Sequence, residues 1–365
     1  MVLAVTLCLI SSPAFAARTE PIIADHTSIR LNQVPLSAIQ DAKSELHIAY
    51  GHTSHGSQIT SGMDGLFTFA NAPYGGSTYA WNNGGTGGAL DLHDYAMSGD
   101  LGNPDRTSWA SRTRTYLNAN PDVNVIMWSW CGQASSATEA DINTYLSLMN
   151  QLEQDYPAVT FVYMTGHLDG SGVSGNLNQR NEQIRAYVRA NNKVLFDFAD
   201  IESYDPDGNY YLNRGATDSC SYTGGNWATA WQNSHTEGVD WYDCGAAHTE
   251  PLNANMKAYA VWHLWARLAG WDGTPVGPTP TPTVTVTPTP AQPVVLPGQT
   301  ALPTDPDNDT LYEDVNANGR KDFGDVVEYF NNMDWIAVNE PLALFDFNGN
   351  GRIDFGDVVL LFDEV

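Results

Sequence analysis

The chain has 365 residues, of which 42 are acidic and 16 basic, so its formal net charge is −26 at pH 7. A surface of this sign repels phosphate backbones and anionic membranes, which argues against a nucleic-acid partner. After the first residues, no stretch approaches the roughly 18 consecutive apolar residues of a membrane-spanning helix, so we expect no membrane span. The length and the shift in composition near residue 274 predict more than one domain.

The N-terminal segment is typical of a secretory signal peptide. It is apolar and ends in the small-residue pattern Ala14-Phe15-Ala16, which predicts cleavage after residue 16 and a secreted, extracellular protein. Cys8 would leave with this segment. In an oxidising compartment a Cys220–Cys244 disulfide would leave Cys131 as a buried free thiol, although the other two pairings of these cysteines stay open.

Four apolar runs predict buried strands, at residues 45–50, 123–128, 159–164 and 193–198. Their near-continuous apolarity is typical of strands covered on both faces. Helical patterns cover residues 140–157 and 176–192, and a last one opens at Pro251 and stops at Gly270. This alternation predicts an α/β domain over residues 17–273, with a parallel sheet between two layers of helices.

The loops that follow parallel strands meet at one edge of the sheet, where ligands bind. The first such loop, "GHTSHGS", holds Ser54 after a strand and before a predicted helix, whose N-terminus would help to stabilise an oxyanion. Ser54 is a candidate nucleophile, or alternatively a helix cap, and Ser57 is a second candidate for either role. His248, just before the last helix, is the best candidate for a general base. Three more histidines at this edge are candidate substrate contacts, secondary bases or metal ligands: His52, His55 and His167.

Over residues 40–270 this arrangement resembles the SGNH (GDSL-like) hydrolase superfamily. "GHTSHG" stands in the place of the Gly-Asp-Ser block, so Ser54 matches the nucleophile. "CGQAS" stands where the third block supplies an amide, for which Gln133 is the nearest residue. Asp243 and His248 stand in the place of the Asp-x-x-His block, but with a longer spacing, so Asp240 or a backbone carbonyl are alternatives for orienting His248.

The resemblance implies a flavodoxin-like three-layer α/β/α domain that hydrolyses esters through an acyl-enzyme and needs no cofactor. It implies Ser54, His248 and Asp243 as the catalytic residues. The oxyanion would be held by Gln133 with the backbone N–H of Ser54 or Gly56, and His52 and His167 would contact substrate.

The substrate expected from the sequence is an O-acetylated polysaccharide, because aromatic faces suit sugar rings. Seven tryptophans support this expectation: Trp81, Trp109, Trp128, Trp130, Trp227, Trp231 and Trp241. Two other functions stay open. One is a non-catalytic glycan-binding module, and the other is a metal-dependent hydrolase that uses His52, His55 and His167.

Residues 274–304 are rich in threonine and proline. Such a segment favours extended polyproline geometry and cannot form a packed core. At ~3.1 Å per residue it would reach on the order of 95 Å when fully extended. It is predicted to be a linker between two domains.

The last segment, residues 305–365, carries two near-identical stretches, "DVNANGRKDFGD" and "DFNGNGRIDFGD". Each has oxygen-bearing side chains at positions 1, 3, 5, 9 and 12, a glycine at position 6 (Gly319 or Gly351) and a backbone carbonyl at position 7. This is the pattern of the EF-hand calcium loop. The predicted Ca²⁺ ligands are Asp314, Asn316, Asn318, Arg320, Asp322 and Asp325 in the first loop, and Asp346, Asn348, Asn350, Arg352, Asp354 and Asp357 in the second.

Two such loops, each followed by an apolar helix, resemble a type I dockerin. The resemblance implies a small all-α module with two structural Ca²⁺ ions and a cohesin-type partner on a scaffold or cell surface. Positions 10 and 11 are Phe-Gly in both loops instead of a polar pair, which leaves the choice of partner open. The preceding "DPDNDTLYED", with Asp305, Asp307 and Asp309, resembles a further calcium-binding turn, but Thr310 replaces the usual glycine, so a third ion also stays open.

Overall fold

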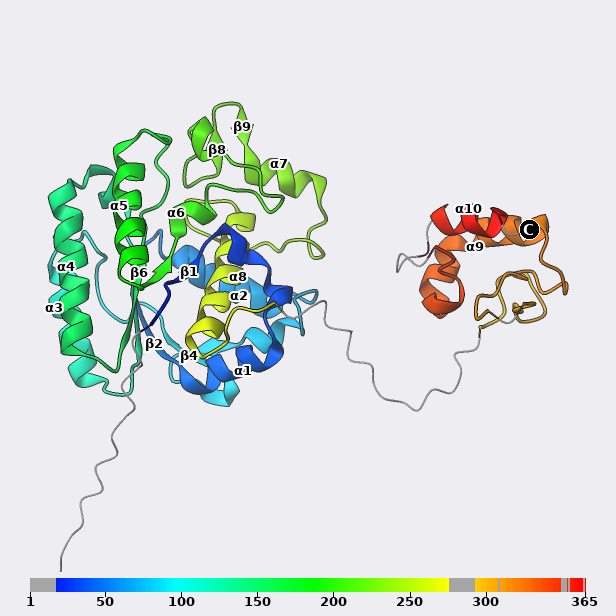
Figure 1. Cartoon of the computed structure of the whole chain (residues 1–365), viewed down its shortest axis with the longest axis horizontal. Helices are drawn as coiled ribbons and strands as arrows, with labels where there is room; N and C mark the ends of the chain where they lie inside the picture. Colours follow the sequence, from blue (N-terminus) through cyan, green and yellow to red (C-terminus); the bar gives the residue numbers. More distant parts are fainter. Residues whose placement is uncertain (1–17, 276–292, 308, 349–352, 354, 364) are drawn as a thin grey trace, which may run out of the picture. The chain divides into compact units, whose positions relative to one another are not determined.

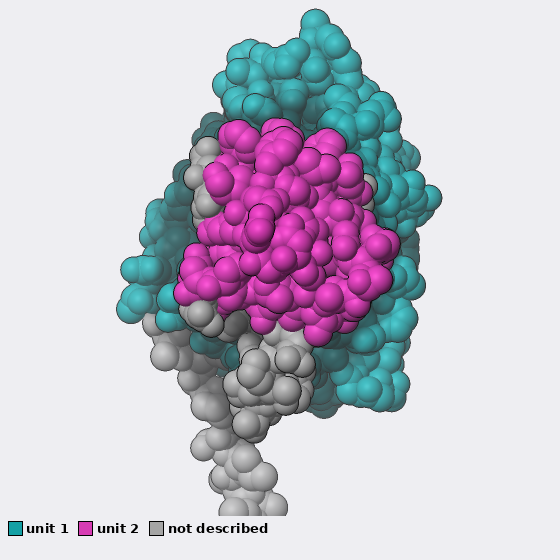
Figure 2. Space-filling view, turned by 90° about the vertical axis from the view of Figure 1, so that its right-hand side faces the viewer, with its two compact units in different colours: residues 1–279 teal, residues 280–365 magenta. Residues whose placement is uncertain are grey.

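The computed structural model describes residues 18–275, 293–307, 309–348, 353, 355–363 and 365 (Figure 1). The predicted signal peptide and residues 276–292 of the predicted linker lie outside the described residues. The chain divides into two compact units, residues 1–279 and 280–365, which are coloured separately in Figure 2. Among the helices of the described segments, none is both long and apolar enough to cross a bilayer.

The first unit is built on a seven-stranded sheet in the order β1-β7-β6-β5-β2-β4-β3, and every neighbouring pair is parallel. This confirms the predicted α/β class. The strands are β1 (Ile22–Ala24), β2 (His47–Gly51), β3 (Trp81–Asn82), β4 (Leu90–His93), β5 (Val125–Trp128), β6 (Thr160–Met164) and β7 (Val194–Phe196).

The four predicted strands correspond to β2, β5, β6 and β7, the apolar strands of the sheet. The sequence did not indicate β1, β3 and β4, which have two to four residues each and lie towards the two edges of the sheet. Because β1 precedes it, β2 is the second strand of the chain. The expectation that the Ser54 loop follows the first strand was therefore wrong, since a three-residue edge strand leaves no apolar run to detect.

Helices cover the sheet on both faces and give three layers (Figure 1). One layer holds α3 (Ser108–Ala119), α4 (Glu139–Asp155) and α5 (Asn176–Ala190), and the other holds α1 (Leu36–Glu45), α2 (Ser57–Thr68) and α8 (Pro251–Leu268). The remaining elements are short: α6 (Phe198–Ile201), α7 (Trp227–Ser234), a hairpin of β8 (Ser221–Tyr222) and β9 (Gly225–Asn226), and 3-10 helices at His26–Ile29, Leu31–Gln33, Gly76–Tyr79, Thr86–Gly88, Gly132–Ser136 and Leu212–Arg214.

Helices α2 and α8 pack closely because of a glycine. A Cβ at Gly62 would lie 2.1 Å from the Ala254 carbonyl oxygen, so only glycine lets the two helices approach this far. A buried ion pair also ties α8 to the rest of the unit: Lys257 Nζ lies 2.7 Å from Glu202 Oε1 and also donates to Gln58 on α2. Both charged side chains are fully buried, so each depends on the other for charge compensation.

The strand order marks a switch point in the sheet. When β2, β4, β5, β6 and β7 are numbered one to five along the chain, their order is 2-1-3-4-5, that of a doubly wound sheet. In this order the direction of winding reverses between β2 and β5. Ligands of such sheets bind outside the carboxyl ends of the two strands at this point.

The three described cysteines are free thiols, so the expected Cys220–Cys244 disulfide is not formed. Cys220 Sγ lies 3.4 Å from Thr249 Oγ1, and Cys244 Sγ lies 3.8 Å from the Pro251 carbonyl oxygen. Both sulfurs thus contact the chain around the start of α8. Cys131 is only half-buried, which corrects the expectation of a buried thiol.

The second unit has a small core of its own between α9 (Phe323–Asn339) and α10 (Phe355–Asp363), with a 3-10 helix at Leu342–Leu344. Each helix begins where a predicted calcium loop ends, which confirms the two helices expected there. Tyr329, Ile336, Phe345 and Leu361 are fully buried in this core.

Candidate functional site

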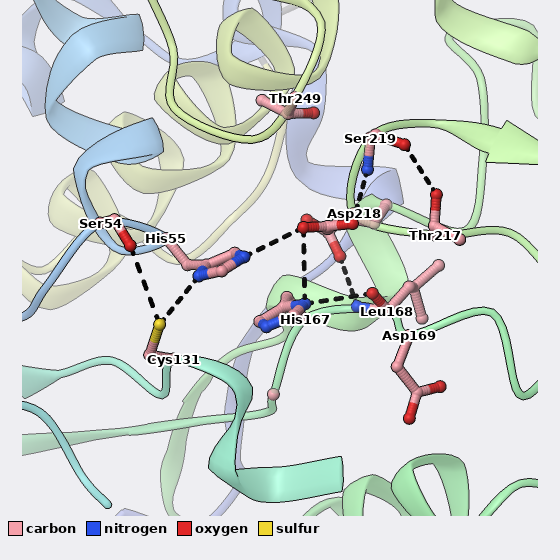
Figure 3. Close-up of polar contacts among 12 residues, drawn as sticks. Ser54, His55, Cys131, His167, Leu168, Asp169, Thr217, Asp218, Ser219 and Thr249 are labelled. Carbon is pink, nitrogen blue, oxygen red and sulfur yellow. Dashed lines mark hydrogen bonds and ion pairs between the residues drawn. The ribbon is translucent and has the colours of Figure 1, made fainter. Parts of the chain in front are cut away.

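The loops after β2, β5 and β6 bring polar side chains together at the switch point of the sheet (Figure 3). β2 and β5 are paired up to Gly51 and Trp128, so the loops that follow the two strands begin side by side. Ser54 and His55 come from the first loop and Cys131 from the second. His167 follows β6, and Asp218 comes from the irregular segment between α6 and α7.

At the centre of the site is a chain of three side chains. His55 Nδ1 lies 3.0 Å from Cys131 Sγ, and His55 Nε2 lies 3.0 Å from Asp218 Oδ2 (Figure 3). Since the Asp218 carboxylate accepts a hydrogen bond from Nε2–H, Nδ1 is left to exchange a proton with the thiol. The His55 side chain thus joins the Cys131 thiol to the Asp218 carboxylate.

These contacts change the charge of both the thiol and the imidazole. The hydrogen bond from His55, together with its positive charge, lowers the pKa of Cys131 to about 6 against the opposing effect of burial. Burial alone would lower the pKa of His55, but the hydrogen bonds to Asp218 and Cys131 outweigh it and raise that pKa to about 9. Near neutral pH the pair is therefore a thiolate and an imidazolium, the reactive form of a cysteine nucleophile.

The main chain around the site holds these groups in position. The Asp218 backbone N–H donates to the Leu168 carbonyl at 3.0 Å, and the Ser219 N–H donates to Asp218 Oδ1 at 2.9 Å, which leaves Oδ2 to face His55. Burial would raise the pKa of Asp218, but the hydrogen bond from His55 and the nearby imidazolium charge hold it below its ordinary value.

The tight turn before α2 needs a glycine at position 56. A Cβ at Gly56 would lie 2.3 Å from His52 Cβ and 2.4 Å from Ser129 Oγ. Gly56 therefore sets the path of the loop that carries His55. Its carbonyl oxygen accepts a hydrogen bond from the Tyr50 hydroxyl at 3.1 Å.

Two further imidazole rings enclose His55. The His167 ring stacks on it at 3.8 Å with an interplanar angle of 0°, and the His248 ring stacks on it at 4.3 Å and 11°. His167 Nδ1 contacts the Leu168 carbonyl, while its Nε2 is buried with no hydrogen-bond partner in the described part of the chain. Burial lowers the pKa of His167, so this ring is neutral near pH 7.

The structure brings Ser54 into the site but does not join it to His248 by a hydrogen bond in the described segments. Ser54 is exposed, and its Oγ lies 3.8 Å from Cys131 Sγ (Figure 3). The Ser57 hydroxyl donates to the Ser54 carbonyl at 2.6 Å, and α2 has Gly56 as its N-cap with no side-chain cap, so neither serine caps this helix. Asp243 and His248 are both exposed, and the hydrogen bonds of the described segments include none between them.

Two other predicted site residues, His52 and Gln133, make hydrogen bonds within the protein. The His52 side chain is fully buried between Tyr50 and Tyr95, with Nε2 2.6 Å from Asp94 Oδ1. Gln133 Oε1 accepts from the Cys131 backbone N–H at 3.1 Å, and its Nε2 lies 3.4 Å from a carboxylate oxygen of Asp100. Gln133 thus holds the backbone of Cys131 in position.

The sequence did not single out Cys131 as a nucleophile, His55 as its base or Asp218 as the orienting carboxylate. Cys131 carried one signal, because it lies in the loop after a predicted strand, three residues past the strand end and at the edge where Ser54 lies. Asp218 carried none, because the chain between α6 and α7 has no long helix or strand that would predict its position.

The tryptophans expected to bind sugar are mostly core residues. Four of the seven are buried, namely Trp109, Trp128, Trp130 and Trp227. Trp81, Trp231 and Trp241 are half-buried, and Trp231 stacks on His235 at 3.5 Å. Only these three have ring surface available to a ligand.

In the second unit, the first predicted calcium loop is wound around two buried carboxylates. Asp314 accepts hydrogen bonds from the Asn318 and Gly319 N–H groups at 2.8 and 2.9 Å, and Asp325 accepts from the Asn316 N–H at 3.0 Å. Asp314 and Asp325 are both fully buried. Burial and the charge of Asp314 raise the pKa of Asp325, despite the hydrogen bonds that it accepts.

A set of oxygen donors around buried like charges fits a hard cation such as Ca²⁺. The second loop repeats one contact of the first, since the Asn348 N–H donates to Asp357 Oδ1 at 3.1 Å. The remaining predicted ligands of that loop, Asn350, Arg352 and Asp354, lie outside the described residues.

Compared with models of known protein families and with curated proteins, the chain shows no match. The function proposed below therefore starts from the geometry of the site.

Proposed function

We propose that the first unit is a hydrolase that cleaves acyl esters through a covalent acyl-enzyme, with the Cys131 thiolate as the nucleophile. The observation that carries this proposal is the contact of His55 with Cys131 through one ring nitrogen and with Asp218 through the other, each at 3.0 Å. A nucleophile, a base and an orienting carboxylate in this order activate cysteine and serine in acyl-transfer enzymes of unrelated folds.

Ester hydrolysis is kept as expected from the sequence, but all three catalytic residues change, and Asp218 takes the orienting role expected of Asp243. The nucleophile becomes Cys131 in place of Ser54, because the sulfur is in direct contact with an imidazole whereas Ser54 Oγ has only its 3.8 Å contact with that sulfur. The base becomes His55 in place of His248.

In the first half of the reaction the Cys131 thiolate attacks the ester carbonyl carbon and forms a C–S bond, while the carbonyl oxygen takes up the negative charge. Collapse of this intermediate breaks the C–O bond, and the leaving alkoxide takes the proton from His55 Nδ1. The alcohol departs and a thioester on Cys131 remains. Asp218 stabilises the imidazolium at the start of this half-reaction.

In the second half, neutral His55 accepts a proton from water, and the hydroxide formed attacks the thioester carbonyl. The C–S bond breaks, which releases the carboxylic acid and restores the thiolate–imidazolium pair. The Ser54 hydroxyl, exposed and near the sulfur, would donate a hydrogen bond to the oxyanion in both halves. The rings of His167 and His248 would keep the His55 ring in one orientation.

The wider setting proposed from the sequence is that of a secreted enzyme acting on an acylated polysaccharide. Support comes from the signal-like N-terminus, the Thr/Pro-rich segment and the half-buried Trp81, Trp231 and Trp241. The SGNH-like order of the motifs supports the reaction class. The dockerin-like repeats support Ca²⁺ binding and attachment to a cohesin-type partner.

A metal-dependent hydrolase is a second candidate, and two observations favour it. His55, His167 and Asp218 each offer a ligand atom, and these atoms lie within 4.8 Å of one another. His167 Nε2 is also buried without a partner in the described part of the chain. His52, the third histidine expected in such a site, contacts Asp94 instead.

The test is hydrolysis of a chromogenic acetyl ester and of an O-acetylated polysaccharide by the full chain. We expect Cys131→Ala to reduce turnover to the background rate. Ser54→Ala should lower kcat by about a hundredfold, the lower end of the effect of removing one oxyanion donor. A chelator should leave the activity unchanged.

An inactive Ser54→Ala enzyme beside an active Cys131→Ala enzyme would refute the proposal. Loss of activity on chelation, restored by Zn²⁺, would instead favour the metal-dependent reading. A folded wild-type protein that binds the polysaccharide without turnover of either ester would identify a glycan-binding module.

A further inference from the structure

The segment before the first calcium loop repeats the oxygen positions of that loop nine residues earlier. Asp305, Asp307, Asp309 and Glu313 precede Asp314, Asn316, Asn318 and Asp322, each by nine positions. In EF-hand numbering these are positions 1, 3, 5 and 9. The fourth member of the upstream set, Glu313, extends the three aspartates that the sequence pattern indicates.

The two segments share two backbone hydrogen bonds to their first aspartate and a positive φ at position 6. The Thr310 N–H donates to Asp305 Oδ2 at 2.9 Å, and the Gly319 N–H donates to Asp314 Oδ2 at 2.9 Å. The N–H group one residue earlier donates to Oδ1 of the same aspartate. In the upstream segment this is Asp309 N–H to Asp305 at 3.3 Å, and in the first loop Asn318 N–H to Asp314 at 2.8 Å. Thr310 has a φ of 89° and Gly319 a φ of 81°, so both segments make a sharp turn at position 6.

Glu313 is the observation that points to a ligand. Its side chain is fully buried, and its Oε2 atom has no hydrogen-bond partner among the residues that the structure describes. A buried carboxylate oxygen without a donor is unfavourable. One carboxylate oxygen of Glu313 and one from each of the three aspartates lie within 4.8 Å of one another.

Within the described residues, one cationic side chain reaches this cluster. Lys321 Nζ lies 3.4 Å from Asp307 Oδ2 and 3.5 Å from Glu313 Oε1. One ammonium group facing four carboxylates leaves an excess of negative charge, and Glu313 Oε2 still has no hydrogen-bond partner among the described residues. A divalent cation would compensate the excess negative charge and would bind Glu313 Oε2.

We propose that Asp305, Asp307, Asp309 and Glu313 form a third cation site, which takes a hard divalent ion such as Ca²⁺. Ligands of Ca²⁺ lie about 2.3–2.6 Å from the ion, so oxygens on opposite sides of it are about 5 Å apart. The spread of the four carboxylates matches this span. The site directly precedes the first loop, because Glu313 is bonded to Asp314, which pairs with Thr304 through two backbone hydrogen bonds of 3.1 and 3.2 Å.

The test counts the Ca²⁺ ions that the chelator-treated full chain takes up from Ca²⁺ alone, by native mass spectrometry and equilibrium dialysis. We expect Glu313→Gln and Asp307→Asn each to bind one ion fewer than the wild-type chain. Glu328→Gln removes a negative charge from α9 in the same unit and should bind the wild-type number. Because Asp307 is exposed, its variant decides the matter if Glu313→Gln does not fold.

The result that overturns the proposal is the wild-type number of ions, with affinities within about twofold, in both Glu313→Gln and Asp307→Asn. The measurement is a difference between variants, so it does not depend on how many ions the two predicted loops bind. It also uses no activity assay, so failure of the proposed ester hydrolysis would leave its outcome unchanged.

Discussion

Removal of the His55 imidazole tests the thiolate–imidazolium pair directly. The hydrogen bond from His55 is the largest cause of the lowered pKa of Cys131, which is about 6 compared with an ordinary value of 9.0. In His55→Ala this cause is absent, so we expect the midpoint of alkylation by iodoacetamide to move from about pH 6 to about pH 9 or above.

The expected rates follow from two opposing effects. At pH 7 a thiol of pKa 6 is about 90% thiolate and one of pKa 9 about 1%, a roughly 90-fold difference. The thiolate of higher pKa is more nucleophilic, by about 20-fold over three pKa units at a Brønsted coefficient of 0.4–0.5. The variant should therefore react about fourfold more slowly at pH 7 and about 20-fold faster at pH 10.

The assay follows alkylation of each cysteine-containing peptide by mass spectrometry between pH 5 and 10. Cys220 and Cys244 serve as internal references, because burial raises the pKa of each to about 12. His248→Ala is the matched control, since that ring stacks on His55 and, within the described residues, makes no hydrogen bond to Cys131. A midpoint near pH 9 in the wild-type chain, unchanged in His55→Ala, would refute the reasoning.

Four further predictions concern the same chain. Asp218→Asn should lower kcat on the order of 10²- to 10⁴-fold with a smaller change in KM, because the amide does not stabilise the imidazolium; equal kcat values would contradict this role. The pH profile of kcat/KM should be a bell between about 6 and about 9, since activity needs deprotonated Cys131 and protonated His55; a single rising limb would count against the pair. Lys257→Met should cost about 3–5 kcal/mol of unfolding free energy in urea, because it leaves the fully buried Glu202 unpaired, and a second change of Glu202 to Leu should restore part of the loss. Removal of Ca²⁺ should reduce the helical circular dichroism signal of the second unit and leave ester hydrolysis unchanged, and a parallel loss of activity would speak against independent units.

The core of the fold could be predicted because its strands are buried on both faces. The runs that became β2, β5, β6 and β7 are almost wholly apolar, which is the strongest local signal of a parallel sheet. The edge strands β1 and β3, and β4 beside β3, were not predicted, for a physical reason. β4 has the sequence Leu-Asp-Leu-His, and its Asp91 accepts a hydrogen bond from the Gly84 N–H, so no apolar run indicates a strand.

The position of the candidate site could also be predicted, because parallel topology brings the loops after the strands to one edge. Its chemistry could not, because it depends on the direction of individual side chains. Ser54 and His55 are neighbours in the sequence, yet Ser54 is exposed and His55 points to both Cys131 and Asp218. Asp218 lies 163 residues after His55 in the sequence, so no local sequence pattern connects the two residues.

The spacing of the calcium-loop segments gave a more complete expectation, because the ligands of an EF-hand lie within twelve consecutive residues. The buried Asp314 and Asp325 and the two helices that follow the loops are where this spacing predicts them. Glu313 was missed as a member of the upstream cluster, since its burial depends on packing within the second unit.

The most direct test of the central claim is to identify the residue that carries the acyl group during turnover. The full chain would be mixed with excess chromogenic acetyl ester, quenched in acid within the first turnovers, digested, and mapped by mass spectrometry. We predict an acetyl thioester on Cys131, both in the wild-type chain and in Ser54→Ala. An acetyl group on Ser54 that is retained in Cys131→Ala would contradict the account.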